Sequence, residues 1–205
     1  MGRRLVFVIG DSISQHYGPH LQEMLSPMLD YARKTGEEPQ LTGTSLEPNA
    51  NGGDSAAVLA YLEAMIRGGG FGPDVLLINC GLHDIKTDPQ TGARQVLLEQ
   101  YRSNLKRIVE LAQAAARKLI WVRTTPVDDE RHNSISTAFY RYAADVDACN
   151  AAADEIMSAA GVPAIDLHAF TVSLGGEVFC DHVHFTEPVR RLQAAFIAGY
   201  LNGRR

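Results

Sequence analysis

A serine, an aspartate and a histidine follow predicted strands of this sequence, at positions where they could meet. Ser12 comes directly after an apolar run near the start of the chain, and Asp181 and His184 lie three residues apart near its end. Serine is a weak nucleophile unless a base takes its proton, and that base needs a third group to orient it. We therefore predict that Ser12 attacks an ester carbonyl, that His184 is the base, and that Asp181 orients His184 and stabilises its charged form.

Four short motifs occur in order along the chain. They are Gly10–Ser12, Gly53–Ser55, Gly81–Asp84 and Asp181–His184. Each motif alone is a weak signal, but four of them in order at predicted strand ends make a specific one. In these motifs the sequence resembles the SGNH (GDSL-type) hydrolases, and the motifs frame nearly the whole chain. The resemblance implies a single flavodoxin-like α/β/α domain that hydrolyses esters or thioesters without a metal or other cofactor.

The resemblance also implies individual roles for the motif residues. Ser12 would be the nucleophile, Asp181 and His184 the other triad members, and the backbone N–H groups of Ser12 and Gly53 donors to the oxyanion. The family usually has an asparagine as a third donor, where this chain has His83. A neutral imidazole has one N–H and can replace the amide if a neighbour fixes its tautomer. His83 could instead be a buried structural histidine.

Apolar patterning predicts the elements that must position these residues. Continuous apolar runs, typical of strands buried on both faces, alternate with apolar residues at helical spacing. This alternation favours a three-layer α/β/α sandwich around a five-stranded parallel sheet, as a single domain over residues 1–205. The expected strands are Leu5–Ile9, a weak Gln40–Leu46, Val75–Asn79, Leu119–Val122 and Val162–Ile165, and the expected helices cover about 16–32, 55–66, 98–115, 135–156 and 189–200.

Other interpretations of the nucleophile and the acid remain open in the sequence. Ser12 could simply cap a helix, because serine is a favoured N-cap residue. Ser55 stands in a second Gly-Asp-Ser and is a rival nucleophile, although its position at a helix start favours capping. Asp166, at the end of the fifth predicted strand, is a second candidate for the acid. Asp181 and His184 could also form only a surface ion pair.

A metal-dependent hydrolase is a further alternative. His182 and His184 have the spacing that places two imidazoles on one face of a strand, and the acidic residues 128–130 with His132 could add ligands. No His-Glu-x-x-His or other compact ligand set accompanies them, so the sequence favours the serine mechanism and predicts no metal site.

Composition and charge limit the class of partner. The chain has 205 residues, of which 45% are hydrophobic and 21% charged, which is ordinary globular usage. Lys and Arg number 19 against 24 Asp and Glu, which gives a formal net charge of -5. A chain with this balance has no overall basic field to attract nucleic acid or an anionic membrane. We therefore expect a small-molecule or glycan ester as the partner, and the sequence does not indicate an oligomeric state.

Cysteine usage and the first residues bear on location. Cys80, Cys149 and Cys180 are an odd number without CxxC spacing, which favours reduced thiols over a disulfide framework or a zinc site. The apolar run Leu5–Ile9 is shorter than the roughly 7–15 residues of a signal-peptide core. No apolar run approaches the roughly 20 residues that span a bilayer. These features favour a cytoplasmic protein.

The expected substrate is a short acyl ester, such as an acetyl ester, on a polar carrier such as a carbohydrate. The polar segment 127–134 is the longest candidate rim of a pocket, and no apolar lid suited to a long acyl chain is evident. A lysophospholipase or thioesterase of the same fold is an alternative. Another is a non-catalytic member that binds acylated glycans, for which the His83 departure is the only indication.

Overall fold

A computed structural model describes residues 2–26, 28–36 and 50–203 of the chain. Five strands form one sheet in the order β2-β1-β3-β4-β5, and every neighbouring pair is parallel. In its register, Val6 of β1 lies beside Tyr31 on one side and Val75 on the other. The predicted five-stranded parallel sheet is confirmed. The strands are β1 (Arg4–Ile9), β2 (Leu29–Arg33), β3 (Val75–Ile78), β4 (Leu119–Val122) and β5 (Ala164–Ile165).

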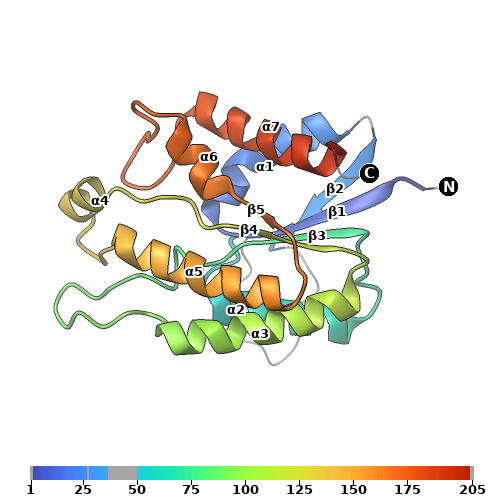
Figure 1. Cartoon of the computed structure of the whole chain (residues 1–205), viewed down its shortest axis with the longest axis horizontal. Helices are drawn as coiled ribbons and strands as arrows, with labels where there is room; N and C mark the ends of the chain where they lie inside the picture. Colours follow the sequence, from blue (N-terminus) through green and yellow to red (C-terminus); the bar gives the residue numbers. More distant parts are fainter. Residues whose placement is uncertain (1, 27, 37–49, 204–205) are drawn as a thin grey trace.

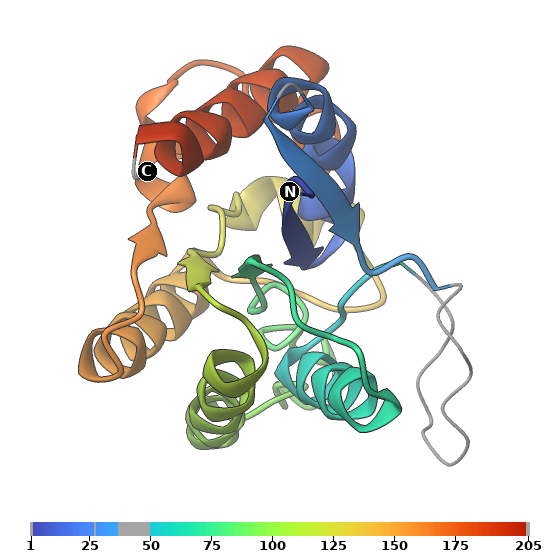
Figure 2. The ribbon, with the colours of Figure 1, turned by 90° about the vertical axis from the view of Figure 1, so that its right-hand side faces the viewer.

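Helices cover both faces of the sheet, as Figures 1 and 2 show. Helices α1 and α7 pack together on one face, and α2, α3 and α5 form the layer on the other. The central strands β1, β3 and β4 are therefore buried on both sides, which explains their almost purely apolar sequences. The helices are α1 (Ser12–Leu25), α2 (Ser55–Gly68), α3 (Leu98–Ala115), α4 (Asp129–Ile135), α5 (Ala143–Ala159), α6 (Leu167–Ser173) and α7 (Glu187–Gly203).

The first predicted helix is too long, because residues 29–33 form the edge strand β2. Helix α1 ends at Leu25, two residues before Pro27. Residues 29–33 pair in parallel with β1, and this long-range pairing outweighs the helical spacing of their apolar side chains. The weak strand predicted at Gln40–Leu46 lies outside the described residues.

The predicted helix over 135–156 is also wrong in its first part. The backbone of Tyr140 pairs in both directions with Thr87, at 2.9 and 2.8 Å, so this segment crosses to the loop after β3. Helix α5 therefore begins only at Ala143, and Ile135 ends the separate short helix α4 with 59% of its surface exposed. Helix α6 was not predicted at all.

The carboxyl ends of the strands meet at one edge of the molecule, where α4 and the loop from β3 to α3 extend to the left in Figure 1. In open parallel sheets this edge is where ligands bind. None of the helices in the described ranges is long and apolar enough to cross a membrane. All three cysteines are free, and Cys80 and Cys149 are buried.

Candidate active site

Ser12 is the first residue of α1 and is held there by the residue before it. The Asp11 side chain caps the helix by accepting a hydrogen bond from the Ile13 N–H at 3.0 Å. The interpretation of Ser12 as the capping residue is therefore wrong. Its hydroxyl is left partly exposed at the carboxyl end of β1.

His184 connects Ser12 to Asp181 through two short hydrogen bonds. The His184 Nε2 lies 2.9 Å from the Ser12 Oγ, and the His184 Nδ1 lies 2.7 Å from Asp181 Oδ2. The second carboxylate oxygen of Asp181 accepts the backbone N–H groups of Val183 and His184, at 2.8 and 2.7 Å. The three predicted residues are thus joined in one chain of hydrogen bonds, which an isolated surface ion pair would not form.

These same contacts stabilise the ionised form of Asp181. Burial opposes ionisation of the carboxyl, but the N–H groups of His184 and Val183 and the His184 ring together hold its pKa well below the usual range. A carboxylate that stays ionised can stabilise a positive charge on the imidazole during a reaction.

His16 is a neighbour of this site that the sequence interpretation left without a role. Its ring centre lies 4.6 Å from that of His184, in a tilted arrangement. It stands four residues after Ser12 on α1, a spacing that places two side chains on one helix face. Burial, followed by the charges of Arg190 and His184, lowers the pKa of His16. The His184 ring therefore packs against the His16 ring, and the environment of His16 favours its neutral form.

Ser55, the rival nucleophile, is fully buried and its groups are engaged. The Ser55 Oγ accepts a hydrogen bond from Asn104 at 2.9 Å, and its N–H donates to the Asp84 carboxyl. The cap of α2 is Asp54, whose side chain accepts the N–H of Ala57. Ser55 thus neither faces solvent nor caps the helix, but ties the start of α2 to the loop after β3.

Asp166, the alternative acid, has partners other than His184. Its carboxyl accepts a hydrogen bond from the Arg123 guanidinium at 2.6 Å and caps α6 through the Ala169 N–H. Both oxygens are used in a structural role at the start of α6, so the structure favours Asp181 as the acid.

Gly53, another predicted donor, lies in a loop next to the Ser12 turn. The Gly52 N–H donates to the Gly10 carbonyl at 2.9 Å, which brings Gly53 beside that turn. Gly53 has a positive φ of 74°, a conformation that favours glycine. Its N–H donates to Asn51 Oδ1 at 2.9 Å, so this donor already has an acceptor.

His83 stands in the loop after β3 and is neutral. Burial, together with the charges of Lys86 and Arg141, lowers its pKa to about 4. Among the described residues, no side chain or backbone group hydrogen bonds to the ring, so none of them fixes the tautomer. The ring keeps one N–H that is available to a ligand.

His182 points away from Ser12 and contacts α4. Its Nδ1 lies 2.8 Å from the Nδ1 of His132, a buried residue of that helix. Both nitrogens of His184 are engaged with Ser12 and Asp181, so the two imidazoles of the His-x-His sequence do not converge. Within residues 2–26, 28–36 and 50–203, no group of three or more His, Cys, Asp or Glu side chains is placed to hold a metal ion.

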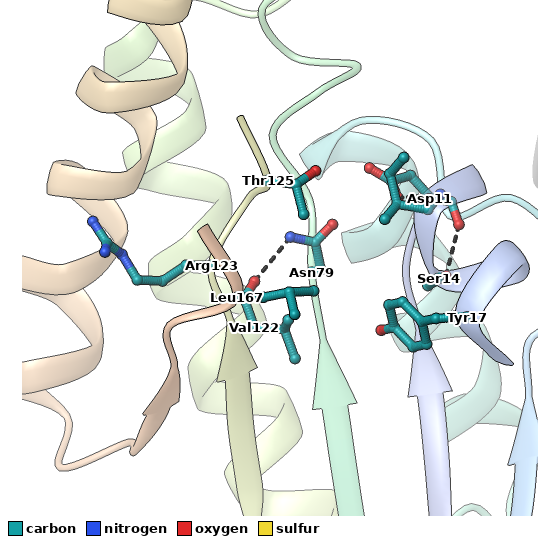
Figure 3. A pocket seen from close by; sticks show the side chains of 9 residues that line it. Asp11, Ser14, Tyr17, Asn79, Val122, Arg123, Thr125 and Leu167 are labelled. Atoms are coloured by element: carbon teal, nitrogen blue, oxygen red, sulfur yellow. Dashed lines mark hydrogen bonds between the residues drawn. The ribbon is translucent and has the colours of Figure 1, made fainter. Parts of the chain in front are cut away.

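A small cavity beneath the site separates the strand ends from α1 (Figure 3). It measures about 10 Å³ and is bordered by Asp11, Asn79 and Thr125 among others. Asn79 donates to the Val122 carbonyl at 2.8 Å and so joins the ends of β3 and β4. This space is far too small for a substrate.

Comparisons with known proteins identify the family of the chain and proteins of similar fold. A model of the GDSL-like lipase/acylhydrolase family matches residues 8–192. Similar folds are seen in a lipase/acylhydrolase from Enterococcus faecalis (TM-score 0.74, 19% identity, 98% of this chain and 96% of that one) and a GDSL-like lipase from Bacteroides thetaiotaomicron (0.66, 17%, 99% and 89%). An acetyl xylan esterase from Geobacillus stearothermophilus is also similar (0.68, 16%, 96% and 93%). No curated protein matches in sequence.

Proposed function

Because the chain belongs to the GDSL-like lipase/acylhydrolase family, we propose that it is a serine ester hydrolase that forms an acyl-enzyme on Ser12. The observation that carries this proposal is the hydrogen-bonded chain from Ser12 through His184 to Asp181. It supplies a nucleophile, a base within reach of its proton, and a carboxylate that orients the base.

The proposed reaction has two steps. The Ser12 Oγ attacks the ester carbonyl carbon while His184 Nε2 takes the hydroxyl proton, and the negative charge collects on the carbonyl oxygen. When the intermediate collapses, the alcohol leaves with the proton from His184. A water molecule then gives its proton to His184 and attacks the acyl-enzyme, which releases the acid and restores Ser12.

Three N–H groups are proposed to bind the charged oxygen. The Ser12 N–H lies in the first turn of α1, where backbone N–H groups lack helical acceptors and the helix dipole favours negative charge. The Gly53 N–H would exchange its Asn51 acceptor for the oxyanion, or share it. The neutral His83 ring supplies the third donor in place of the family's amide.

Replacing His83 tests the third donor. His83→Ala is expected to lower kcat by about 10²–10³-fold with little change in KM, because this interaction strengthens as charge develops in the transition state. His83→Asn restores an amide donor and is expected to retain much more activity. Since the pKa of His83 is lowered to about 4, the ring is neutral above about pH 5, and His83→Asn should leave the pH profile there unchanged.

Measuring kcat and the melting temperature of both His83 variants separates a donor from a structural residue. A structural histidine would show lower melting temperatures with nearly unchanged kcat in the folded fraction. An asparagine variant as inactive as the alanine variant would overturn the donor assignment.

We further propose a short acyl group, such as acetyl, on a polar carrier such as a carbohydrate. Helix α4, which carries His132 of the His132 and His182 pair, begins with the charged residues Asp129, Glu130 and Arg131. Charged residues at the edge of the proposed substrate site favour a hydrated carrier over a lipid. A protein of similar fold from Geobacillus stearothermophilus is an acetyl xylan esterase, and this likeness supports the proposal. The free cysteines are consistent with the proposed cytoplasmic location.

Hydrolysis of 4-nitrophenyl esters with acyl chains of rising length tests the proposed substrate class. We expect kcat/KM to be highest for acetate or propionate and to fall beyond about four carbons, because a long chain would gain no apolar cover. A maximum at eight or more carbons would instead indicate a lipid ester or thioester substrate and contradict the short-acyl proposal.

A further inference from the structure

A buried arginine lies next to His83 with part of its guanidinium unpaired. Arg141 is only 4% exposed, and its Nε donates to the Leu82 carbonyl at 2.7 Å. Its backbone is fixed as well, because its N–H and carbonyl both bond the side chain of Asn133. In the part of the chain described, the two terminal nitrogens have no hydrogen-bond partner and are not sealed from solvent. These two nitrogens therefore keep N–H donors that no described residue uses.

A second cation, Lys86, shares an aromatic ring with Arg141. The Lys86 Nζ and the Arg141 Cζ each lie 4.8 Å from the centre of the Phe139 ring. Burial, and then the charge of Arg141, lowers the pKa of Lys86, while burial lowers the pKa of Arg141 to about 10. Arg141 remains charged at neutral pH. The positive charge of Arg141 thus acts on Lys86, and an anion bound near both cations would offset this repulsion.

The carboxyl groups whose charges act on this pair are those of Asp54 and Asp11, and only the Asp11 Oδ2 lacks a hydrogen-bond partner. Asp54 accepts hydrogen bonds from Gln95 at 2.6 Å and from a backbone N–H of α2. Asp11 caps α1, and burial raises its pKa. Among the described residues, neither carboxyl forms an ion pair with Lys86 or Arg141. A buried arginine without an ion-pair partner is unusual, because removing its charge from water costs free energy.

We propose that Lys86 and Arg141 form a subsite that binds a carboxylate of the ester substrate beside His83. This inference rests on the proposed esterase function, and it narrows the substrate to esters that carry a negative charge. A guanidinium with two free nitrogens binds a carboxylate in a paired geometry that an ammonium group can support with its point charge. The carboxylate is separate from the ester that reacts, so it belongs either to the acyl part or to the alcohol part of the substrate.

Two pairs of substrates show whether the carboxylate belongs to the acyl part or to the alcohol part of the substrate. The acyl part is tested with 4-nitrophenyl hemisuccinate against 4-nitrophenyl butyrate, and the alcohol part with acetylated galacturonic acid against its methyl ester. In one of these pairs, we expect kcat/KM to be at least about 10-fold higher for the substrate with the carboxylate than for its neutral analogue. This is the size of effect that one hydrogen bond to a charged group gives. The preferred pair identifies which part of the substrate carries the charge.

Substitutions then assign the preference to these two residues. Arg141→Gln is expected to reduce the ratio of charged to neutral kcat/KM by about 10–100-fold, and Lys86→Gln by about 10-fold. Lys86→Glu should make the neutral member the better substrate, because it places a negative charge at the subsite. Lys106→Gln, which removes one positive charge from the exposed face of α3, is the matched control and should leave the ratio unchanged.

The possible failures differ in their meaning. If the wild-type enzyme hydrolyses charged and neutral members of both pairs equally, the subsite is overturned and the esterase function stands. If Arg141→Gln lowers both rates in proportion, and Lys86→Glu does not change the ratio, both residues are structural and the proposal is wrong. If no ester is hydrolysed at all, the proposed function fails and the subsite fails with it. Lys86 is only partly buried, so its variants give a result even if Arg141→Gln does not fold.

Discussion

Replacing Ser12 with alanine is expected to lower kcat for 4-nitrophenyl acetate by about 10⁴-fold or more. The reason is that the Ser12 Oγ is the atom placed 2.9 Å from His184 Nε2, so its removal leaves the base without a nucleophile to activate. KM is expected to change little, because the hydroxyl contributes mainly after binding. Initial rates of the purified variant, corrected for any background hydrolysis, measure the effect.

Ser55→Ala is the matched control for Ser12→Ala. It removes a hydroxyl from the other Gly-Asp-Ser sequence, where the Oγ is buried against Asn104. We expect this variant to lose about 1–3 kcal/mol of stability, since Asn104 loses a partner, and to keep most of its kcat when folded. Substantial turnover by Ser12→Ala, or loss of turnover by folded Ser55→Ala, would show that the nucleophile has been misassigned.

Removing the His184 ring is expected to have an effect as large as removing Ser12. His184→Ala should lose turnover by about 10⁴-fold or more, because the residues of a triad act as a unit. His182→Ala should retain most of its activity, because the His182 ring faces His132 on α4. Comparing kcat/KM of the two variants with the wild type measures the difference between neighbouring histidines of the same chain segment.

Chelation adds an independent control to the histidine comparison. A serine mechanism needs no ion, so dialysis of the wild-type enzyme against a chelator should leave ester hydrolysis unchanged. Equal losses in His182→Ala and His184→Ala, with activity that zinc or manganese restores after chelation, would contradict the triad and favour the metal-dependent alternative.

The geometry around Ser12 was predictable because it depends on strand ends. Apolar runs identify β1, β3 and β4, and parallel strands bring the residues that follow them to one edge of the sheet. The spacing of three between Asp181 and His184 predicts their mutual contact, and the structure has that contact at 2.7 Å. These inferences use only periodicity and short-range spacing, which a sequence contains directly.

The parts that were missed depend on tertiary contacts. Residues 29–33 carry apolar side chains at helical spacing, yet they pair with β1 as an edge strand. Arg141 falls in a segment whose apolar spacing predicts a helix, but backbone pairing of Tyr140 with Thr87 carries it to the loop after β3. Arg141 and Lys86 contact the Phe139 ring because this segment crosses to the loop after β3. Long-range pairing of this kind leaves no local signal in the sequence.

The contact between His16 and His184 is an intermediate case. The spacing of four residues from Ser12 places His16 on the same face of α1, and this signal is visible in the sequence. What the sequence lacks is the course of residues 174–186, which carries His184 onto that face. A residue one helical turn from a predicted nucleophile is therefore a candidate neighbour of the active site, even when it belongs to no motif.

Labelling with a fluorophosphonate tests the central claim most directly. Such a probe reacts with a serine hydroxyl that a neighbouring base has activated, and it forms a stable covalent adduct. We expect the intact protein to gain the mass of one label, peptide mapping to place it on Ser12, and His184→Ala to prevent labelling at the same exposure. A label on Ser55, or no label on protein that hydrolyses esters, would contradict the assignment of Ser12 as the nucleophile.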